Sequence, residues 1–357
     1  MAIQYAFNSS SYRMASYAFA DGKNLTTAEL FAAHPIHVAD GTTNVSFSGL
    51  GVAGLTIIGS NANTTTITGD AGGNTLIGGR GTNDKLTGGS GNDTLISGAG
   101  NDTLAGGAGD DIYVFSKGDG QDTITDSQGS NVIRFLDVKS NEITLVRNGN
   151  DLKILYGESD SVTIQNAATS TSYRMASHEF ADGKSLTTTE LLALCPVHVA
   201  DGTTSVSFSG LGFAGATIVG TDANNTTITG DAGGNTLIGG KGTNDTLKGG
   251  SGADILMGGK GNDLLQGGAG NDTYLFSKGD GQDIVYDSQG SNAVRFLDVK
   301  SDEITLVRSG NDLKILYGES DSVTIQSHFS GSSYQMANYE FADVTLIGVD
   351  LFAMHGM

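Results

Sequence analysis

Residues 88–114 read GGSGNDTLI, SGAGNDTLA and GGAGDDIYV, which makes three consecutive blocks of nine residues. Residues 249–275 repeat the pattern as GGSGADILM, GGKGNDLLQ and GGAGNDTYL. Each block has the form G-G-x-G-x-D-x-U-x, where U is a large apolar residue. A flexible glycine-rich linker would not keep an aspartate and an apolar residue at fixed positions, so the pattern indicates a folded repeat.

The role of each position follows from its residue type. Glycines at positions 1, 2 and 4 allow positive φ and close backbone approach, which a six-residue turn needs. The aspartate at position 6 is a hard anionic oxygen donor suited to Ca²⁺. Positions 7 to 9 form a strand too short to be stable alone, so its inward side chain must be buried by stacking on neighbouring coils. These inward residues are Leu95, Leu104, Tyr113, Leu256, Leu265 and Tyr274.

This block resembles the calcium-binding nonapeptide of RTX (haemolysin-type) proteins, and the resemblance implies a parallel β-roll. If each block makes half a coil, the turns of blocks i and i+2 lie on the same side. An ion between two such turns would take carboxylate and carbonyl oxygens from both. We therefore expect four paired turns: Asp84 with Asp102, Asp93 with Asp111, Asp245 with Asp263, and Asp254 with Asp272.

Ten aspartates are the expected metal ligands, and several Ca²⁺ ions, about three or four, are expected in each roll. Asp122 and Asp283 are included although a shift of two residues precedes them. Asn74 and Asn235 stand where aspartate is expected, and a neutral ligand predicts empty or weak sites there. Ser97 replaces the first glycine of one block. The ligands are Asp84, Asp93, Asp102, Asp111, Asp122, Asp245, Asp254, Asp263, Asp272 and Asp283.

A longer internal repeat contains both arrays. The segment SYRMAS places Tyr12 and Tyr173 in the same context, and SYQMAN does so for Tyr334. The spacing predicts two near-identical units, residues 36–196 and 197–357. Residues 1–35 are a third copy of the last part of a unit, and we interpret them as an extra junction or cap segment.

The end of each unit predicts a small cap. Residues 136–164 alternate apolar and polar around Asn148-Gly149, which is typical of an antiparallel hairpin, and residues 161–165 make a further strand. Thr26 with Glu29 has capping-box spacing for a short helix, repeated later in the chain, whereas Gly348 leaves the last copy of that helix in doubt. The predicted fold is all-β: two tandem parallel β-rolls stapled by calcium, each with a small antiparallel β cap and a short helix.

Composition excludes several classes of protein. The 357 residues carry 19 Lys+Arg against 39 Asp+Glu, a net charge of −20, which disfavours nucleic-acid binding. One cysteine allows no intrachain disulfide. The N-terminal sequence has no apolar h-region, and no stretch approaches eighteen apolar residues, so we expect neither a cleaved signal peptide nor a membrane span.

Other motifs in the chain are weaker. The dinucleotide-like Gly49-x-Gly51-x-x-Gly54 is followed by strand-like sequence, which favours simple turns. His34-x-x-His37 becomes Cys195-x-x-His198 in the second copy, and no further ligands are clustered nearby, so structural or surface roles are favoured. Threonine-rich runs at 64–68 and 226–229 are too short for an ice-binding array. No H-E-x-x-H or G-x-S-x-G occurs, and we expect no enzyme activity.

The function predicted from these observations is structural. We expect a calcium-dependent extracellular repeat protein of a bacterial surface layer, adhesin or self-assembling filament, which folds on Ca²⁺ after type I export. The alternative is the C-terminal chaperone and secretion region of a larger secreted enzyme, and the starting Met1 and the duplication favour the first. Head-to-tail self-association is an open possibility, in which residues 1–35 either supply strands to a neighbour or cover their own first coil.

Overall fold

The computed structural model describes residues 16–49, 52–80, 83–210, 212, 215–241 and 244–356. The chain folds into two compact units. Unit 1 contains Met1–Thr144 and Asn150–Thr188, and unit 2 contains Leu145–Gly149 and Thr189–Met357. The boundaries expected from the sequence, at residues 35/36 and 196/197, remain a prediction.

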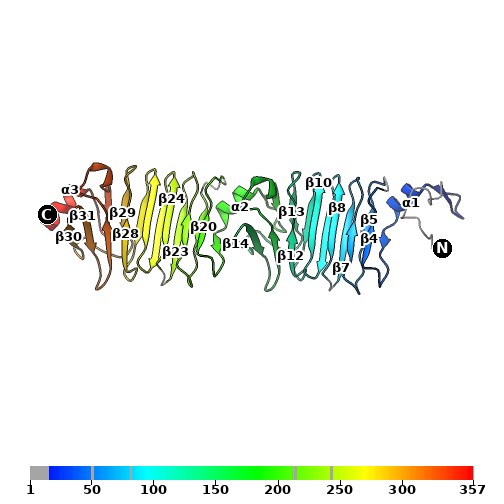
Figure 1. The fold of residues 1–357 in the computed structure, drawn as a ribbon, viewed down its shortest axis with the longest axis horizontal. Helices are drawn as coiled ribbons and strands as arrows, with labels where there is room; N and C mark the ends of the chain where they lie inside the picture. The colour runs from blue at the N-terminus through cyan, green and yellow to red at the C-terminus, as the bar shows by residue number, and fades with distance from the viewer. Residues whose placement is uncertain are drawn as a thin grey trace. The chain divides into compact units, whose positions relative to one another are not determined.

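Unit 1 is a parallel β-roll whose coils alternate between two sheets (Figure 1). The first sheet has the order β18-β17-β13-β11-β9-β7-β5-β3 and is parallel except for β17–β18. Its strands are β3 (Ile36–His37), β5 (Thr56–Ile58), β7 (Thr75–Arg80), β9 (Thr94–Ala99), β11 (Ile112–Phe115), β13 (Val132–Phe135), β17 (Ser177–Glu179) and β18 (Ser185–Leu186). The second sheet contains β4 (Asn44–Ser46), β6 (Thr66–Thr68), β8 (Lys85–Ser90), β10 (Thr103–Ala108), β12 (Gln121–Ile124), β16 (Ser161–Ile164) and β15 (Asp151–Leu155).

Unit 2 repeats this β-roll. One sheet contains β14 (Thr144–Asn148), β19 (Val197–Val199), β21 (Thr217–Val219), β23 (Thr236–Lys241), β25 (Ile255–Lys260), β27 (Thr273–Phe276), β29 (Ala293–Phe296), β33 (Asn338–Glu340) and β34 (Thr345–Leu346). The other has the order β20-β22-β24-β26-β28-β32-β31-β30. Its strands are β20 (Ser205–Ser207), β22 (Thr227–Thr229), β24 (Thr246–Ser251), β26 (Leu264–Ala269), β28 (Gln282–Val285), β32 (Ser322–Ile325), β31 (Asp312–Leu316) and β30 (Thr305–Ser309).

The core of each roll is a stack of the inward residues expected from the repeat. In unit 1, Leu95 pairs in register with Leu76 on one side and Tyr113 on the other. All three are 0% exposed, and so are Leu256 and Tyr274 in unit 2. The strands are longer than the three residues predicted, because β9 runs from Thr94 to Ala99 and thus continues into the first positions of the next block.

Close stacking explains the glycine at position 2 of a block. Gly107 has φ +104°, and a Cβ placed on it would lie 2.2 Å from the carbonyl oxygen of Gly89 in the coil below. A side chain at this position would therefore clash with backbone as well as strain the local conformation. The glycine spacing sets how closely successive coils approach.

The cap elements follow each roll. β16 pairs in parallel with β12, and β17 with β13, so the roll continues beyond the nonapeptides. The short helices are α1 (Thr27–Ala33), α2 (Thr188–Leu194) and α3 (Gly348–His355), with 3₁₀ turns η2 (Thr171–Tyr173) and η3 (Ser332–Tyr334). A hairpin of β1 (Tyr17–Ala18) and β2 (Asn24–Leu25) precedes α1. None of the described helices is long and apolar enough to cross a membrane.

The helix caps show which sequence signals were decisive. The capping box of α1 is present, because the Thr26 side chain accepts from the Glu29 N–H and the Glu29 side chain accepts from the Thr26 N–H. The doubt about α3 is resolved in favour of a helix, although Ile347 at its N-cap makes no side-chain hydrogen bond. Gly356 ends the helix in the left-handed conformation, and Leu351 is the fully buried residue of the helix.

Candidate metal centre

The aspartates of unit 1 form two rows along the turns of the roll. Row A contains Asp84, Asp102 and Asp122, and row B contains Asp93 and Asp111. In row A the N–H of Asp84 donates to Oδ1 of Asp102 at 2.6 Å, and the N–H of Asp102 donates to Oδ1 of Asp122 at 2.9 Å. In row B the N–H of Asp93 donates to Oδ1 of Asp111 at 2.8 Å. The turns paired by the sequence argument are therefore neighbours.

Unit 2 contains the same two rows. The N–H of Asp245 donates to Oδ1 of Asp263 at 2.6 Å, and that of Asp263 to Oδ1 of Asp283 at 2.9 Å. The N–H of Asp254 donates to Oδ1 of Asp272 at 2.8 Å. All ten predicted ligands thus lie in ladders with one carboxylate oxygen held by the preceding turn, and each is at most 2% exposed.

The second carboxylate oxygen of most of these residues is left without a partner. Oδ2 is buried and has no hydrogen-bond partner among the described residues in eight of them: Asp93, Asp102, Asp111, Asp122, Asp254, Asp263, Asp272 and Asp283. A buried carboxylate without a partner is strongly disfavoured unless a cation compensates its charge. The donor set is therefore suited to a hard cation such as Ca²⁺.

The electrostatics of the rows point the same way. Burial raises the pKa of Asp93 to about 6, that of Asp102 and Asp111 to about 7, and that of Asp122 to about 8. Neighbouring carboxylates in the row raise the pKa further, and backbone N–H donors oppose both effects. Proximity to a divalent cation would reverse this shift because it favours the charged form.

Glycine at position 1 provides room for the carboxylate. A Cβ on Gly106 would lie 2.0 Å from Oδ2 of Asp111, and a Cβ on Gly267 would lie 2.2 Å from Oδ2 of Asp272. The free oxygen therefore occupies space that any other residue would fill. Glycine at position 1 thus leaves space for the carboxylate, which differs from the conformational reason at position 2.

Comparison with protein families agrees with this geometry. The model described as the RTX calcium-binding nonapeptide repeat matches residues 79–113 and 241–274. Both arrays are RTX calcium-binding repeats. A second model, the haemolysin-type calcium binding protein related domain, matches residues 151–190. That second match covers β15, β16 and the cap that follows the first RTX array.

Among solved structures, the chain is similar to the extracellular lipase LipA from Serratia marcescens, with 19% identity and a TM-score of 0.18. The match covers 73% of this chain and 42% of the lipase. The chain therefore spans less than half the length of that enzyme. A superposition with so low a score carries no information about the activity of this chain.

Each RTX row ends at a neutral residue. The N–H of Asn74 donates to Oδ1 of Asp93, and its Nδ2 also donates to that carboxylate at 3.2 Å. At the far end of row B, the N–H of Asp111 donates to Oδ1 of Asn131 at 2.9 Å. Thr65 stands at the start of row A. The expectation of weak sites at Asn74 and Asn235 remains a prediction.

A second ladder escaped the sequence argument. Position 5 of the RTX blocks carries Asn83, Asn92 and Asn101, and their side chains accept N–H groups from the next turn along. Asn83 accepts from Asn101 at 3.0 Å, and Asn101 accepts from Gln121 at 2.9 Å. The recurrence of asparagine at this position was the available signal. This ladder runs opposite to that of the aspartates and aligns the exposed side of the turns.

Two further polar groups close the core at the end of the RTX array. The hydroxyl of Tyr113 donates to Oδ2 of Asp126 at 2.5 Å and accepts from the N–H of Gly106 at 2.7 Å. Tyr274 and Asp287 repeat this contact in unit 2. Tyrosine at an inward position therefore extends across the core to the turn of a neighbouring coil. Its position in the repeat indicated burial but not this partner.

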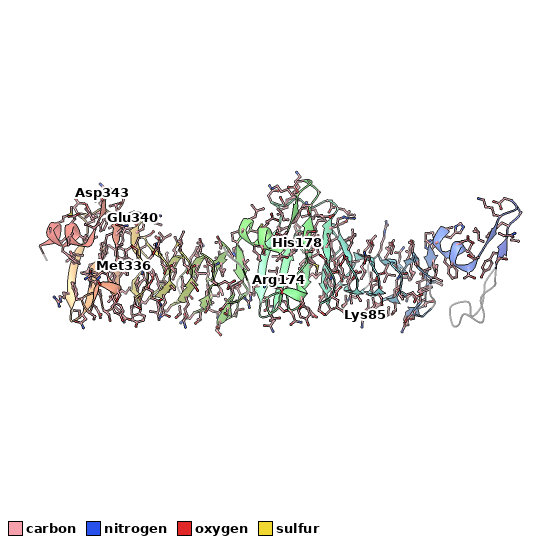
Figure 2. All side chains as sticks on the ribbon, turned by 90° about the horizontal axis from the view of Figure 1, so that it is seen from above. Lys85, Arg174, His178, Met336, Glu340 and Asp343 are labelled. Atoms are coloured by element: carbon pink, nitrogen blue, oxygen red, sulfur yellow. The ribbon has the colours of Figure 1, made fainter. Side chains whose placement is uncertain are left out.

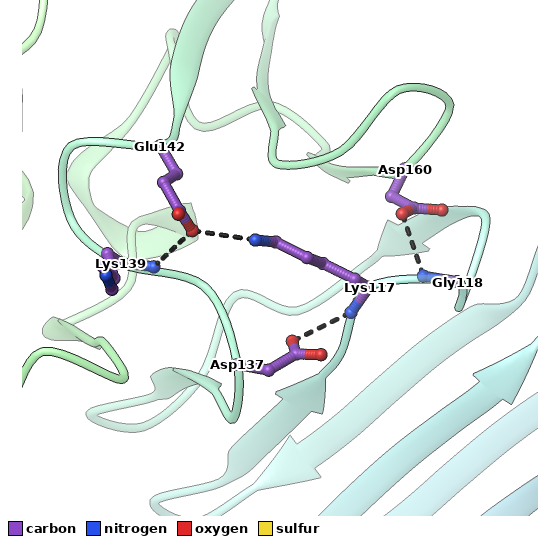
Figure 3. A network of polar contacts seen from close by, with 6 residues as sticks. All are labelled: Lys117, Gly118, Asp137, Lys139, Glu142 and Asp160. Carbon is purple, nitrogen blue, oxygen red and sulfur yellow. Dashed lines mark hydrogen bonds and ion pairs between the residues drawn. The ribbon is translucent and has the colours of Figure 1, made fainter.

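The last turn of the first array is fixed by carboxylates from the cap segment. Asp160 accepts the N–H of Gly118 at 2.9 Å, and Asp137 accepts the N–H of Lys117 at 2.9 Å. The ammonium of Lys117 pairs with Glu142 at 2.9 Å (Figure 3). Glu142 also accepts the N–H of Lys139. These contacts come from residues distant in sequence, so the nonapeptide pattern could not reveal them.

The histidine, cysteine and dinucleotide-like motifs of the sequence do not form a metal or nucleotide site among the described residues. Within the described ranges, no group of three or more His, Cys, Asp or Glu side chains is placed to hold a metal. His34 and His37 are exposed, and Cys195 is buried. The dinucleotide-like motif lies partly outside the described residues, and strand β5 follows it where a nucleotide fold needs a helix. An ion in the aspartate rows would accordingly be held by two carboxylates and by backbone carbonyl oxygens.

Proposed function

We propose that this chain is a calcium-dependent extracellular structural repeat protein that folds on binding Ca²⁺ after export. The observation that carries this proposal is the set of eight buried carboxylate oxygens without partners, arranged in two rows per unit. RTX repeats bind calcium and are typical of type I secreted extracellular proteins. The proposal assigns the chain neither a catalytic activity nor a nucleic-acid partner.

The aspartate rows supply the mechanism. Ten aspartates would hold the ions, two to a site along each row, with the remaining oxygens from the turns. Bound Ca²⁺ supplies positive charge between carboxylates that otherwise repel one another in a buried environment. Because a preformed site rarely exists in an unfolded chain, the free energy of binding becomes free energy of folding.

The small size of the core explains why folding would need the free energy of Ca²⁺ binding. Each coil buries only one large inward side chain per half-turn, such as Leu95 or Leu104, and the turns between are rich in glycine. Glycine loses more backbone entropy on ordering than any other residue. Extracellular Ca²⁺ at about 10⁻⁴–10⁻³ M is in the range over which extracellular modules bind it.

Circular dichroism of the full chain at about pH 7.5, where the row carboxylates are largely ionised on unfolding, tests this function in chelator, in millimolar Ca²⁺ and in millimolar Mg²⁺. We expect a disordered spectrum in chelator, β structure in Ca²⁺, and no recovery in Mg²⁺, which demands octahedral geometry and loses water reluctantly. Equal β content in all three conditions would refute the linkage of folding to calcium.

A further inference from the structure

Strand β14 completes the first coil of unit 2. Leu145–Gly149 belongs to unit 2, although the chain on both sides of it belongs to unit 1. β14 pairs in parallel with β19, with Leu145 opposite Val197, Val146 opposite His198 and Arg147 opposite Val199. The N–H of Ala200 extends this ladder by donating to the carbonyl of Arg147 at 2.9 Å.

Side chains also bury one another at this pairing. Leu145 and Val197 are 0% exposed. Arg147 is buried to 6% exposure, and its guanidinium donates to the carbonyl of Ser207 and lies 4.4 Å from the centre of the Phe208 ring. β14 thus contributes a backbone ladder, an apolar residue and a stacked arginine to the first coil of unit 2.

The same sequence occurs in β30 without such a partner. Residues 304–308 read ITLVR, as residues 143–147 do. β30 ends the order of its sheet, so no described strand pairs with its outer edge. Val307 is 39% exposed, and Leu306 is only half-buried. Arg308 turns to its own cap, where its guanidinium lies 4.4 Å from the Phe329 ring centre.

The complementary edge occurs in unit 1. β3 corresponds to β19, and it ends the order of its sheet, with no described strand on its outer side. Ile36 and Val38 are half-buried, whereas Val197 is fully buried in unit 2. The N–H of Val38 donates to the carbonyl of Ile58. Because successive residues of a strand face opposite edges, the N–H of His37 points to the open side.

We propose that β30 of one molecule adds to β3 of a second copy of the chain, in the register in which β14 adds to β19. Leu306 would pair with Ile36, Val307 with His37, and Arg308 with Val38. An edge strand with unpaired N–H and C=O groups is a template for this kind of addition. The partner is argued from the interface that the chain already makes within unit 2, and the proposal rests on the structural function above.

Such a contact is heterologous, because it joins the end of one molecule to the start of another. It leaves β3 of the first molecule and β30 of the second open, so association continues into a chain or closes into a ring. The β1–β2 hairpin is a copy of the β33–β34 hairpin. In unit 2 the place beside β29 is already occupied by β33, so the β1–β2 hairpin of the incoming molecule does not have to enter that sheet. Folding of both edges on Ca²⁺ would make the assembly calcium-dependent.

Two proline variants of the full chain test the contact. The carbonyl of Arg147 accepts from β19, and the N–H and C=O of one strand residue point to the same edge. Arg308 is the equivalent residue of β30, so its N–H points to the open edge of that strand. Arg308→Pro removes that donor, and His37→Pro removes the donor on the open side of β3. In sedimentation velocity with millimolar Ca²⁺, we expect the wild type to grow with concentration and each variant to remain monomeric.

Mixing the two variants gives the decisive outcome. An equimolar mixture retains one intact β30 and one intact β3 for each pair of molecules, so we expect a dimer and nothing larger. Arg308→Ala keeps the N–H and should weaken association about tenfold through the lost stacking. Leu306→Lys, at the position equivalent to the fully buried Leu145, is a second blocking variant if a proline prevents folding.

Circular dichroism of the same samples separates this proposal from the proposed function. A wild type that folds in Ca²⁺ but stays monomeric at high concentration would overturn the β30–β3 contact alone. Association of both proline variants at wild-type strength would overturn it as well. Failure of the wild type to respond to Ca²⁺ would count against the proposed function instead.

Discussion

The two units differ on the outside of the roll and agree on the inside. Residues that face outward change freely, as Lys85 becomes Thr246 and Thr103 becomes Leu264. The inward residues of the three consecutive blocks and all five aspartates of each array are the same in both units, whereas the inward Ile124 beyond them becomes Val285. The repeat therefore retains the core and the carboxylate rows, and the outer faces are free to carry different chemistry.

One difference reaches the carboxylate rows. Unit 2 has Gly258 at position 1 of a block, and a Cβ there would lie 2.2 Å from Oδ2 of Asp263. Unit 1 has Ser97, which is 0% exposed, with its hydroxyl 3.5 Å from Oδ2 of Asp119. A small polar residue is therefore accepted at this position where a neighbouring carboxylate can receive its hydroxyl. We expect the Ser97 side chain to reduce the space available to Asp102.

The largest effect expected in both units is the pH dependence of the calcium-free chain. The pKa of Asp122 and of Asp283 is raised to about 8 by burial, from an unfolded value of about 3.9. The folded state thus binds more protons than the unfolded state between these values. The two carboxyl groups therefore contribute stability that is fully present below about pH 4 and is lost as pH rises to about 8. In chelator, circular dichroism should show β structure increasing from pH 8 to pH 5.

Asp122→Asn and Asp283→Asn probe whether the two units respond alike. Each substitution should reduce the pH dependence by a similar amount, because the two carboxylates share burial and neighbours. A calcium-free chain whose β content stays constant between pH 8 and pH 5 would contradict the raised pKa values.

Next in size is the loss of an aspartate from the middle of a row. Asp102 is bonded to Asp84 on one side and Asp122 on the other, so Asp102→Ala should weaken two sites. Asp84→Ala is the matched control, because Thr65 precedes it and only one carboxylate neighbour remains. Each lost site should cost about 3 kcal/mol when Ca²⁺ is a hundredfold above its Kd. Calorimetric titration that loses equal heat in both variants would disprove the sharing.

Exchange of the position 1 residues between units should have a smaller effect. Gly258→Ser should reduce the affinity of the Asp263 site about tenfold, because its Cβ displaces the carboxylate from the row. Ser97→Gly should increase the affinity of the Asp102 site by a similar factor. The test is a competition titration with a calcium chelator of known affinity. A change of the same sign in both variants would show that space is not the cause.

The smallest effect concerns the cap of unit 1. His178 is fully buried, and this lowers its pKa to about 4, whereas unit 2 has Tyr339 at the same place. The unfolded state then binds the extra proton below about pH 6.5, so stability falls as pH is lowered. We expect a loss of about 1 kcal/mol at pH 5.5 that His178→Tyr abolishes, measured by thermal unfolding in Ca²⁺. An identical loss in the variant would assign it to other groups.

Much of the fold could be predicted because the nonapeptide encodes it locally. The phase of Asp93 and Leu95 within one block is enough to place a turn, an inward side chain and the neighbour two blocks away. Strand length was underestimated, because the glycines after each inward residue also pair, as Gly79 does with Gly98. The helix α3 forms without a capping side chain because burial of Leu351 outweighs the poor N-cap.

Contacts from outside the repeat could not be predicted. Nothing in the spacing of Asp160 shows that it accepts the N–H groups of Gly118 and Gly120. In the same way, Arg295 pairs with Glu340, and Ser301 donates to Asp343, across 42 or more residues of unit 2. Figure 2 labels Glu340 and Asp343 in that cap. The alternation around Asn148-Gly149 predicted a hairpin but gave no information about which edge would be completed by β19.

Hydrogen exchange of the full chain, followed by mass spectrometry with and without Ca²⁺, tests most directly whether the aspartate rows determine folding. We predict that β7–β12 and β23–β28 are protected in millimolar Ca²⁺ at pH 7.5, and that this protection is lost in chelator and is not restored by Mg²⁺. Equal protection of these strands in chelator and in Ca²⁺ would contradict the account.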